Sequence, residues 1–203
     1  MIPFPNKKYQ IIYADPPWSY KTYSNKNVCP YPVMSNEDIY NLPVSRIADE
    51  NCVLFLWVTF PKLLEGVETI KQWGFSYKSL AFCWVKRNKK NGDYFWGMGY
   101  WTRQNAEVCL LATKGKPKRK SMGVHCIVDE KISGHSQKPD EARKRIVTLM
   151  GDLPRIELFA RQKTEGWDVW GNETDKFNSE KGLFAEPILI TTVKQLKEGG
   201  WKH

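Results

Sequence analysis

Residues Tyr9–Trp18 read YQIIYADPPW, an apolar run that stops at an aspartate, two prolines and a tryptophan. The run has the length and composition of a buried strand. Two consecutive prolines have no backbone N–H, so this strand cannot continue in a sheet beyond Asp15. A carboxylate, a rigid kink and a large aromatic ring therefore follow the carboxyl end of a strand, which is where open α/β sheets bind ligands.

The DPPW tetrad also indicates what kind of ligand. Asp15 and the Pro16 carbonyl offer two hydrogen-bond acceptors side by side, because prolines fix the backbone and leave that carbonyl outside any ladder. Two acceptors suit an amino group, and Trp18 supplies a flat face for a planar ring. We interpret the tetrad as a pocket for the exocyclic amine of an extruded nucleobase. The alternative is a strand end capped by a turn, with Trp18 in the core.

DPPW as it stands at Asp15–Trp18 resembles the signature of methyltransferases that transfer a methyl group from S-adenosylmethionine to a base nitrogen. The chain is similar to the MT-A70 family, the beta-class adenine N6 methyltransferases that include the messenger-RNA writer and many bacterial and phage enzymes. The other stretches that carry the resemblance, in the family's order, are PYPVMS at 30–35, LFLWVT at 54–59, KPDEAR at 138–143, IELFAR at 156–161 and WGNE at 170–173.

The resemblance implies an α/β fold: a Rossmann-like S-adenosylmethionine-dependent methyltransferase sheet with helices on both faces. It also implies a permuted motif order, with the catalytic tetrad early and the cofactor strand late. No GxGxxG phosphate loop occurs in the sequence, which suits a cofactor without phosphates. We expect one methyltransferase domain at 1–176 and a C-terminal tail at 177–203 that packs on the domain or on a partner.

The resemblance further implies roles for single residues. The catalytic residues are Asp15, Pro16, Pro17 and Trp18, and the cofactor-binding residues are Asp15, Lys138, Phe159, Arg161, Asn172 and Glu173. Lys138 stands just before a helix opening at Pro139, and the resemblance assigns it the carboxylate of the cofactor. On the substrate side we expect Tyr20, Tyr31, Trp57 and Glu107. Core packing for Trp57 and structural hydrogen bonding for Glu107 are the alternatives.

Charge points to the same class of partner. The formal net charge is +9, which favours a polyanionic partner. Basic residues cluster at 86–90 and again at 114–120, where Lys116, Lys118 and Arg119 are our candidate substrate contacts. The loop 88–104 carries five aromatic residues after the first cluster, and we interpret it as a nucleic-acid contact. A hydrophobic loop folded over the core or over a partner is the alternative. The polar loop 19–33 is expected to act as a substrate gate.

Other segments set the remaining expectations. Helices are expected to open at Ser35, at Pro61 and at Pro139, and a short one at 192–198. The strands expected after the first are 51–59, 79–85, 106–113, 125–128, 155–160 and 167–170. The five cysteines have no CxxC spacing, so we expect reduced thiols and no metal site. No long apolar segment or signal peptide is evident, and we expect a cytoplasmic protein with no membrane contact.

The predicted function is methyl transfer from S-adenosylmethionine to the N6 amine of adenine in nucleic acid, with DNA favoured over RNA. An N4-cytosine DNA methyltransferase is one alternative, since cytosine offers the same kind of amine. A non-catalytic nucleic-acid-binding subunit of a methyltransferase complex is the other. A homodimer or a partner subunit is a further expectation, because no large target-recognition domain is evident in the sequence.

Overall fold

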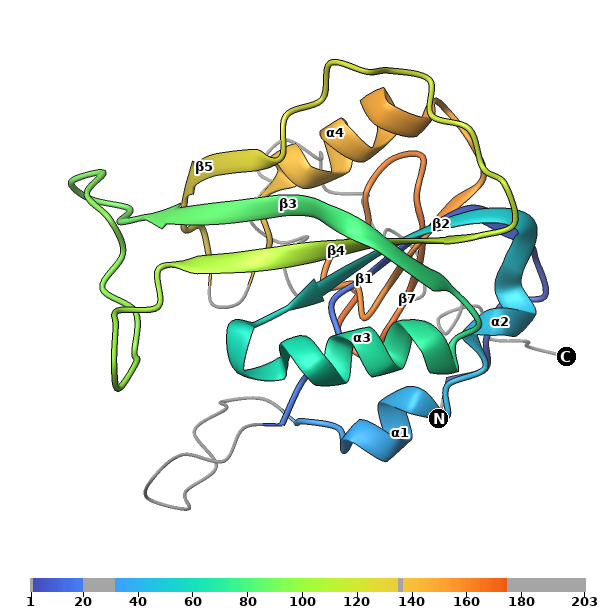
Figure 1. The fold of residues 1–203 in the computed structure, drawn as a ribbon, viewed down its shortest axis with the longest axis horizontal. Coiled ribbons are helices and arrows are strands. Elements are labelled where there is room, and N and C mark those ends of the chain that lie inside the picture. Colours follow the sequence, from blue (N-terminus) through green and yellow to red (C-terminus); the bar gives the residue numbers. More distant parts are fainter. Residues whose placement is uncertain (1, 20–31, 135–136, 175–203) are drawn as a thin grey trace, which may run out of the picture.

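β1 (Tyr9–Ala14) lies inside a seven-stranded sheet of the order β5-β3-β4-β2-β1-β6-β7, counted over the described residues (Figure 1). The structure, a computed structural model, describes residues 2–19, 32–134 and 137–174. The other strands are β2 (Ala48–Val58), β3 (Ser76–Arg87), β4 (Ala106–Lys114), β5 (Ile127–Lys131), β6 (Arg155–Leu158) and β7 (Asp168–Trp170). The helices are α1 (Asn36–Tyr40), α2 (Val44–Ile47), the 3-10 turn η1 (Phe60–Lys62), α3 (Leu63–Gln72) and α4 (Asp140–Met150).

Strand direction decides which loops share an edge of the sheet. β1 is parallel to both neighbours, β2 and β6, and β6 is parallel to β7. β4 is antiparallel to β2 and to β3. The carboxyl ends of β1, β2, β3, β6 and β7 and the amino end of β4 therefore lie along one edge, which we call the carboxyl edge. Asp15, which follows β1, and Phe159, which follows β6, are consequently neighbours in space.

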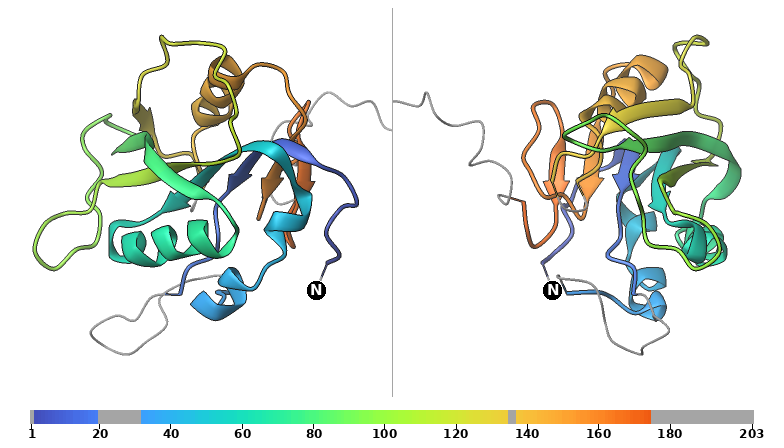
Figure 2. Two further views of the ribbon diagram at one scale, coloured as in Figure 1. Left: turned by 45° about the vertical axis from the view of Figure 1, so that its right-hand side comes forward. Right: turned by 90° about the vertical axis from the view of Figure 1, so that its left-hand side faces the viewer.

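Helices cover both faces of this twisted sheet (Figures 1 and 2). Successive residues of β1 point to opposite faces, as in any strand. Ile11 and Tyr13 belong to the core cluster that includes Ala142 and Ile146 of α4. Ile12 and Ala14 belong to the cluster formed with α1 and α3. The predicted α/β sheet with helices on both faces is confirmed.

A buried ion pair ties α4 to the sheet. The Arg143 guanidinium donates from Nε and Nη2 to the two carboxylate oxygens of Glu157 on β6, each at 2.7 Å. Both side chains are almost fully buried. Arg143 also lies over the Tyr13 ring, 5.6 Å from its centroid. This arrangement holds the start of α4, and with it Lys138, against the carboxyl edge.

Several expected elements have different boundaries. β2 begins at Ala48 rather than 51, because Ala48 pairs with Tyr9 even though the next two residues are charged and point outward. The helix that opens at the N-cap Ser35 ends at Tyr40, before Pro43, and Pro43 instead caps α2. β3 also begins earlier than expected, β5 lies two residues later, and β6 ends at Leu158.

The apolar spacing of α3 does not mark its buried face. Ile70 is buried, but Leu64 is 81% exposed, and Leu63 and Val67 are also exposed. The helix instead packs through Gly66, where an added Cβ would lie 2.4 Å from Cγ1 of Val58 on β2. A glycine thus allows the helix backbone to approach the sheet closely, and the longer side chains of the first turns remain at the surface.

Several expectations lie outside the described residues. These are Tyr20, Tyr31, most of the expected gate loop 19–33, and the tail 177–203 with its expected helix at 192–198. The division into a domain at 1–176 and a tail stays a prediction. In the part of the chain that is described, no helix is long and apolar enough to cross a membrane.

Candidate active site

Asp15 stands at the centre of the site, because it forms part of the wall of two adjoining cavities. The smaller, of about 50 Å³, lies at the carboxyl edge and is lined by Asp15, Pro16, Pro17, Trp18, Trp57, Val58, Thr59, Glu107, Lys138 and Arg161. The larger, of about 360 Å³, is lined by Ile2, Asp15, Pro17, Pro32, Val33, Met34, Leu42, Phe159, Ala160, Arg161, Trp170, Gly171, Asn172 and Glu173. Asp15, Pro17 and Arg161 are shared by both.

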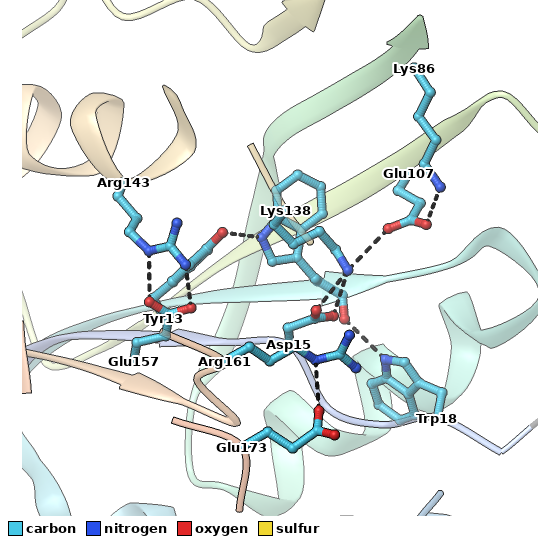
Figure 3. A network of polar contacts seen from close by, with 11 residues as sticks. Tyr13, Asp15, Trp18, Lys86, Glu107, Lys138, Arg143, Glu157, Arg161 and Glu173 are labelled. Atoms are coloured by element: carbon cyan, nitrogen blue, oxygen red, sulfur yellow. Dashed lines mark hydrogen bonds and ion pairs between the residues drawn. The ribbon is translucent and has the colours of Figure 1, made fainter. Parts of the chain in front are cut away.

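Four charged groups form a chain of ion pairs, and three of them, Asp15, Lys138 and Glu107, line the smaller cavity (Figure 3). The Lys138 ammonium contacts both carboxylate oxygens of Asp15, at 2.8 and 2.7 Å. It also pairs with Glu107 at 3.2 Å, and Glu107 in turn accepts a hydrogen bond from Lys86. Lys138 is only 8% exposed. Positive and negative groups alternate from Lys86 to Asp15, so each buried charge has an opposite neighbour.

The alternation of positive and negative groups determines the protonation states of Glu107 and Lys138. Burial alone would raise the pKa of Glu107, but the ammonium groups of Lys138 and Lys86 outweigh it and lower that pKa to about 2. Burial alone would lower the pKa of Lys138, but the Asp15 and Glu107 carboxylates outweigh it and raise that pKa. Glu107 is therefore ionised and Lys138 protonated throughout the physiological pH range.

The turn after β1 uses its own polar groups in part. The Trp18 backbone N–H donates to the Pro16 carbonyl at 2.9 Å, so this carbonyl is not free of internal partners as the sequence suggested. A carbonyl oxygen has two lone pairs, and one remains for a ligand. Trp18 is only 3% exposed, and its Nε1 donates to the Trp57 carbonyl at 3.1 Å. Trp18 is thus a core residue that also lines the cavity, as in the alternative interpretation, rather than an open stacking face.

Trp57 and Glu107, the two other described residues that were predicted on the substrate side, both make contacts within the protein. Trp57 is fully buried, and its Nε1 donates to the Tyr13 hydroxyl at 2.6 Å. The Lys138 ammonium lies 5.5 Å from the centroid of the Trp57 ring. Glu107 is the ion-pair partner of two lysines. Both residues line the smaller cavity, and both also have the structural role that the sequence left open for them.

The larger cavity is built from the ends of β6 and β7. Phe159 and Arg161 follow β6, and Asn172 and Glu173 follow β7. Phe159 has φ of 61°, a left-handed conformation that is uncommon for a bulky residue and that is often found at functional sites. Its ring packs edge-on against Trp170, with the centroids 5.4 Å apart. Arg161 pairs with Glu173 at 3.5 Å across the cavity mouth.

Not all predicted site residues come together. Lys138 lines the smaller cavity but not the larger one, where the other predicted cofactor residues lie. Lys116, Lys118 and Arg119 lie at the opposite edge of the sheet, because β4 runs antiparallel to β2 and ends at Lys114, opposite Cys52. These three residues therefore line neither cavity, and their contact with the substrate stays a prediction that needs a nucleic acid long enough to reach this edge.

Sequence reasoning also missed parts of the site. Ile2 lines the larger cavity, and its carbonyl accepts a hydrogen bond from Trp170 Nε1 at 3.2 Å. Met34 and Leu42 line the same cavity from the segment around α1. Lys86 was assigned only to a basic cluster, yet it pairs with Glu107. Met34 lies within the PYPVMS stretch that carries the family resemblance, which could have found it. No local signal marks Ile2, Leu42 or Lys86, since each reaches the site through a contact distant in sequence.

Neither thiols nor metal ligands gather at the site. The four cysteines in the described part of the chain, Cys52, Cys83, Cys109 and Cys126, are free thiols. Over the same residues, no group of three or more histidine, cysteine, aspartate or glutamate side chains is arranged to hold a metal ion. The charged groups that line the two cavities are Asp15, Glu107, Lys138, Arg161 and Glu173.

Comparison with known proteins assigns the chain to a family. The sequence model described as MT-A70 matches residues 9–173. The chain is 33% identical to the Type II methyltransferase M.MunI from a Mycoplasma species, over 83% of this chain and 79% of that protein. It is 30% identical to the Drosophila melanogaster N(6)-adenosine-methyltransferase MT-A70-like protein and to the human N(6)-adenosine-methyltransferase catalytic subunit METTL3, over 93% of this chain in each case.

The share of each relative that is matched differs. The chain spans 30% of the Drosophila protein and 31% of human METTL3, against 79% of M.MunI. The family model covers well over half of the chain and includes every described site residue except Ile2. The chain belongs to the MT-A70 family.

Proposed function

We propose that this chain, an adenine-N6 methyltransferase of the MT-A70 family, takes its methyl group from S-adenosylmethionine and acts on DNA. The observation that carries the proposal is the position of Asp15 in the shared wall of two cavities of unequal size. A methyl donor in the larger cavity and a target amine in the smaller one would meet at this residue. The names of the relatives, N(6)-adenosine-methyltransferase and Type II methyltransferase, support the reaction.

The larger cavity fits S-adenosylmethionine in size and in chemistry. Its volume of about 360 Å³ is within the range of ~300–1,000 Å³ typical of small-molecule sites. Phe159, Met34 and Leu42 provide apolar wall, and Asn172 and Glu173 provide polar groups. A carboxylate such as Glu173 can accept hydrogen bonds from both hydroxyls of a ribose. When bound, S-adenosylmethionine supplies an electrophilic methyl group on a positively charged sulfur.

The smaller cavity fits the amine. Its volume of about 50 Å³ suits an amino group and the edge of a ring rather than a complete base, so the ring would lie at its mouth. The Asp15 carboxylate retains acceptor sites beside those that Lys138 uses, and the Pro16 carbonyl retains one lone pair. These two acceptors would receive the two N–H groups of the adenine amine.

Hydrogen bonding to both N–H groups addresses the main difficulty of the reaction. The adenine amine is a poor nucleophile, because its lone pair is delocalised into the ring. Acceptors at Asp15 and Pro16 help to localise that lone pair, and they stabilise the positive charge that develops on nitrogen during attack. Lys138 and Glu107 keep Asp15 in place, since the ammonium group contacts both oxygens of the Asp15 carboxylate.

DNA is favoured over RNA by the pattern of matches. The relative with the higher identity, and the one matched over most of its own length, is the Type II methyltransferase M.MunI. The N(6)-adenosine-methyltransferases are matched over less than a third of their length. We further propose that the chain acts as a homodimer or with a partner subunit, since a domain of this size offers little surface for target recognition.

The test is methyl transfer from labelled S-adenosylmethionine to matched single-stranded DNA, duplex DNA and RNA, followed by mass spectrometry of the nucleosides. We expect N6-methyladenine in DNA, and a loss of turnover of at least ~10²-fold in Asp15→Ala, as for removal of one transition-state hydrogen bond. Glu50→Ala is the control, because it removes an exposed carboxylate at the opposite edge of the sheet. N4-methylcytosine as the product, or turnover retained in Asp15→Ala, would contradict the proposal; product in RNA alone would overturn the choice of DNA.

A further inference from the structure

The loop between β3 and β4 presents a group of aromatic side chains to solvent. Trp96 is 70% exposed and Trp101 is 90% exposed, and Tyr94, Met98 and Tyr100 are exposed as well. We call these five residues, four aromatic side chains and one methionine, the aromatic surface. Large side chains of this kind are rarely left in water together unless they bind something. The adenine site described above makes no use of any of them.

The aromatic surface is part of a folded loop. The Phe95 N–H donates to the Lys86 carbonyl at 2.9 Å, which returns the chain to the end of β3. Gly97 is buried, and a Cβ added there would lie 1.7 Å from the Gln104 carbonyl oxygen. The two arms of the loop are therefore in close contact at Gly97. Residues 98–101 project beyond this contact, and the rings of Tyr100 and Trp101 pack edge to face at 5.2 Å.

The loop lies at the carboxyl edge, on the same side as Asp15. It joins the carboxyl end of β3 to the amino end of β4, and Figure 1 shows it extending from these ends. The Phe95 N–H donates to the carbonyl of Lys86, whose ammonium group pairs with Glu107, the partner of Lys138. Lys138 contacts Asp15. The base of the loop is thus linked to the catalytic carboxylate through three consecutive ion pairs.

Cations accompany the rings. The Arg87 guanidinium lies over the Tyr94 ring at 4.0 Å, and that of Arg103 lies over the Trp96 ring at 4.5 Å. Lys89 and Lys90 are exposed in the same loop. Residues 86–104 contain five basic residues and one acidic residue. The core of a protein–protein interface is also rich in aromatic residues, methionine and arginine, but it is depleted in lysine. Lysines beside exposed rings are instead typical of surfaces that bind single-stranded nucleic acid.

We propose that the aromatic surface binds nucleic acid by stacking on unpaired bases that flank the target adenine. The inference rests on the proposed function, because an amine can enter the small cavity only if its base leaves the stack, and this exposes the faces of the neighbouring bases. Trp96, Tyr100 and Trp101 replace the lost stacking partners, and Lys89, Lys90 and Arg103 meet the adjacent phosphates.

The test measures binding of the full chain to a fluorescein-labelled single-stranded DNA oligonucleotide of mixed sequence, by fluorescence anisotropy and without cofactor. One stacked base accounts for roughly a five- to 150-fold change in affinity, so we expect Trp101→Ala to raise the Kd by about tenfold or more. Trp101→Phe should restore most of the affinity, because it keeps a ring. Leu64→Ala, which removes an equally exposed apolar side chain from α3, should bind as the wild type does.

Salt dependence separates stacking from charge. Trp101→Ala should leave the slope of log Kd against log salt unchanged, while Lys89→Gln with Lys90→Gln should reduce it by about 1.4 if each lysine meets one phosphate. A wild-type chain that does not bind the oligonucleotide, or a Trp101→Ala chain that binds it as tightly as wild type, would overturn the proposal. So would conversion of a dimer to a monomer in Trp101→Ala with unchanged DNA binding, because the surface would then be a protein interface.

Failure of this inference is distinguishable from failure of the proposed function. Calorimetry of S-adenosylmethionine binding should give the same affinity for Trp101→Ala and wild type, which shows that the fold and the larger cavity are intact. Suppose that Trp101→Ala loses DNA binding and that the wild-type chain forms no N6-methyladenine. The aromatic surface would then be supported as a DNA-binding surface, and the proposed methylation reaction would be contradicted. If the wild-type chain forms N6-methyladenine and Trp101→Ala binds DNA as tightly as wild type, the proposed reaction would be supported and the role of the aromatic surface would be contradicted.

Discussion

Neutralising Glu107 should destabilise the fold in a way that depends on pH. Its pKa falls from the ordinary value of 4.5 to about 2 in the folded chain, and each pKa unit corresponds to ~1.4 kcal/mol. The ionised carboxylate therefore contributes about 3 kcal/mol to the free energy of unfolding at neutral pH. Because the folded pKa is depressed, this contribution is complete above about pH 5.5 and is lost as the pH falls from about 4.5 through 2.

Urea unfolding of wild type and Glu107→Gln, at a series of pH values from 7 downward, measures this contribution. At pH 7 we expect the variant to be less stable by about 3 kcal/mol, and we expect the difference between the two chains to shrink below pH 4.5. Glu130→Gln, which alters an exposed glutamate on β5, should stay within about 0.5 kcal/mol of wild type. A Glu107→Gln chain as stable as wild type at pH 7, or a difference independent of pH, would refute the assigned role of the two lysines.

Two further substitutions test the packing that positions the site. Arg143→Met leaves the buried Glu157 carboxylate without its guanidinium partner and should cost about 3–5 kcal/mol in urea unfolding, whereas Arg143→Met with Glu157→Leu should recover most of it; equal losses in both would contradict the pairing. Gly66→Ala forces a Cβ against Val58 and should cost about 1–3 kcal/mol in thermal unfolding. Val58→Ala in the same chain should relieve that cost, and its failure to do so would refute the contact.

The parts of the fold that local sequence encodes were predicted well. An apolar run that meets Pro16 and Pro17 has to end there, because neither proline has an N–H for a ladder. Ser35 caps α1 through a hydrogen bond from the Asp38 N–H at 3.0 Å, as its position before two acidic residues suggested. The resemblance to the MT-A70 family, read from short motifs in order, is confirmed by the family match over residues 9–173.

Predictions that depended on distant contacts were weaker. The basic residues at 116–119 follow a strand correctly predicted at 106–113, but the sequence of that strand does not specify its direction. Because β4 is antiparallel to β2, these residues lie at the edge of the sheet opposite Asp15, and only the pairing of the strands decides this. We predicted that Trp18 offers a flat face to a planar ring, yet its indole donates to the carbonyl of Trp57 and the ring is buried. Each outcome depends on a pairing across the sheet.

The sequence by itself determined the DPPW turn, the strands that lead to the site and the family, since proline chemistry, apolar runs and short motifs act within a few residues. Only the tertiary structure decided that Lys138, which lies 123 residues from Asp15 in sequence, contacts both oxygens of its carboxylate. The same is true of Glu107 and Lys86, whose charges complete the chain. Long-range ion pairs form where strand order and direction bring side chains together, and no local pattern carries that information.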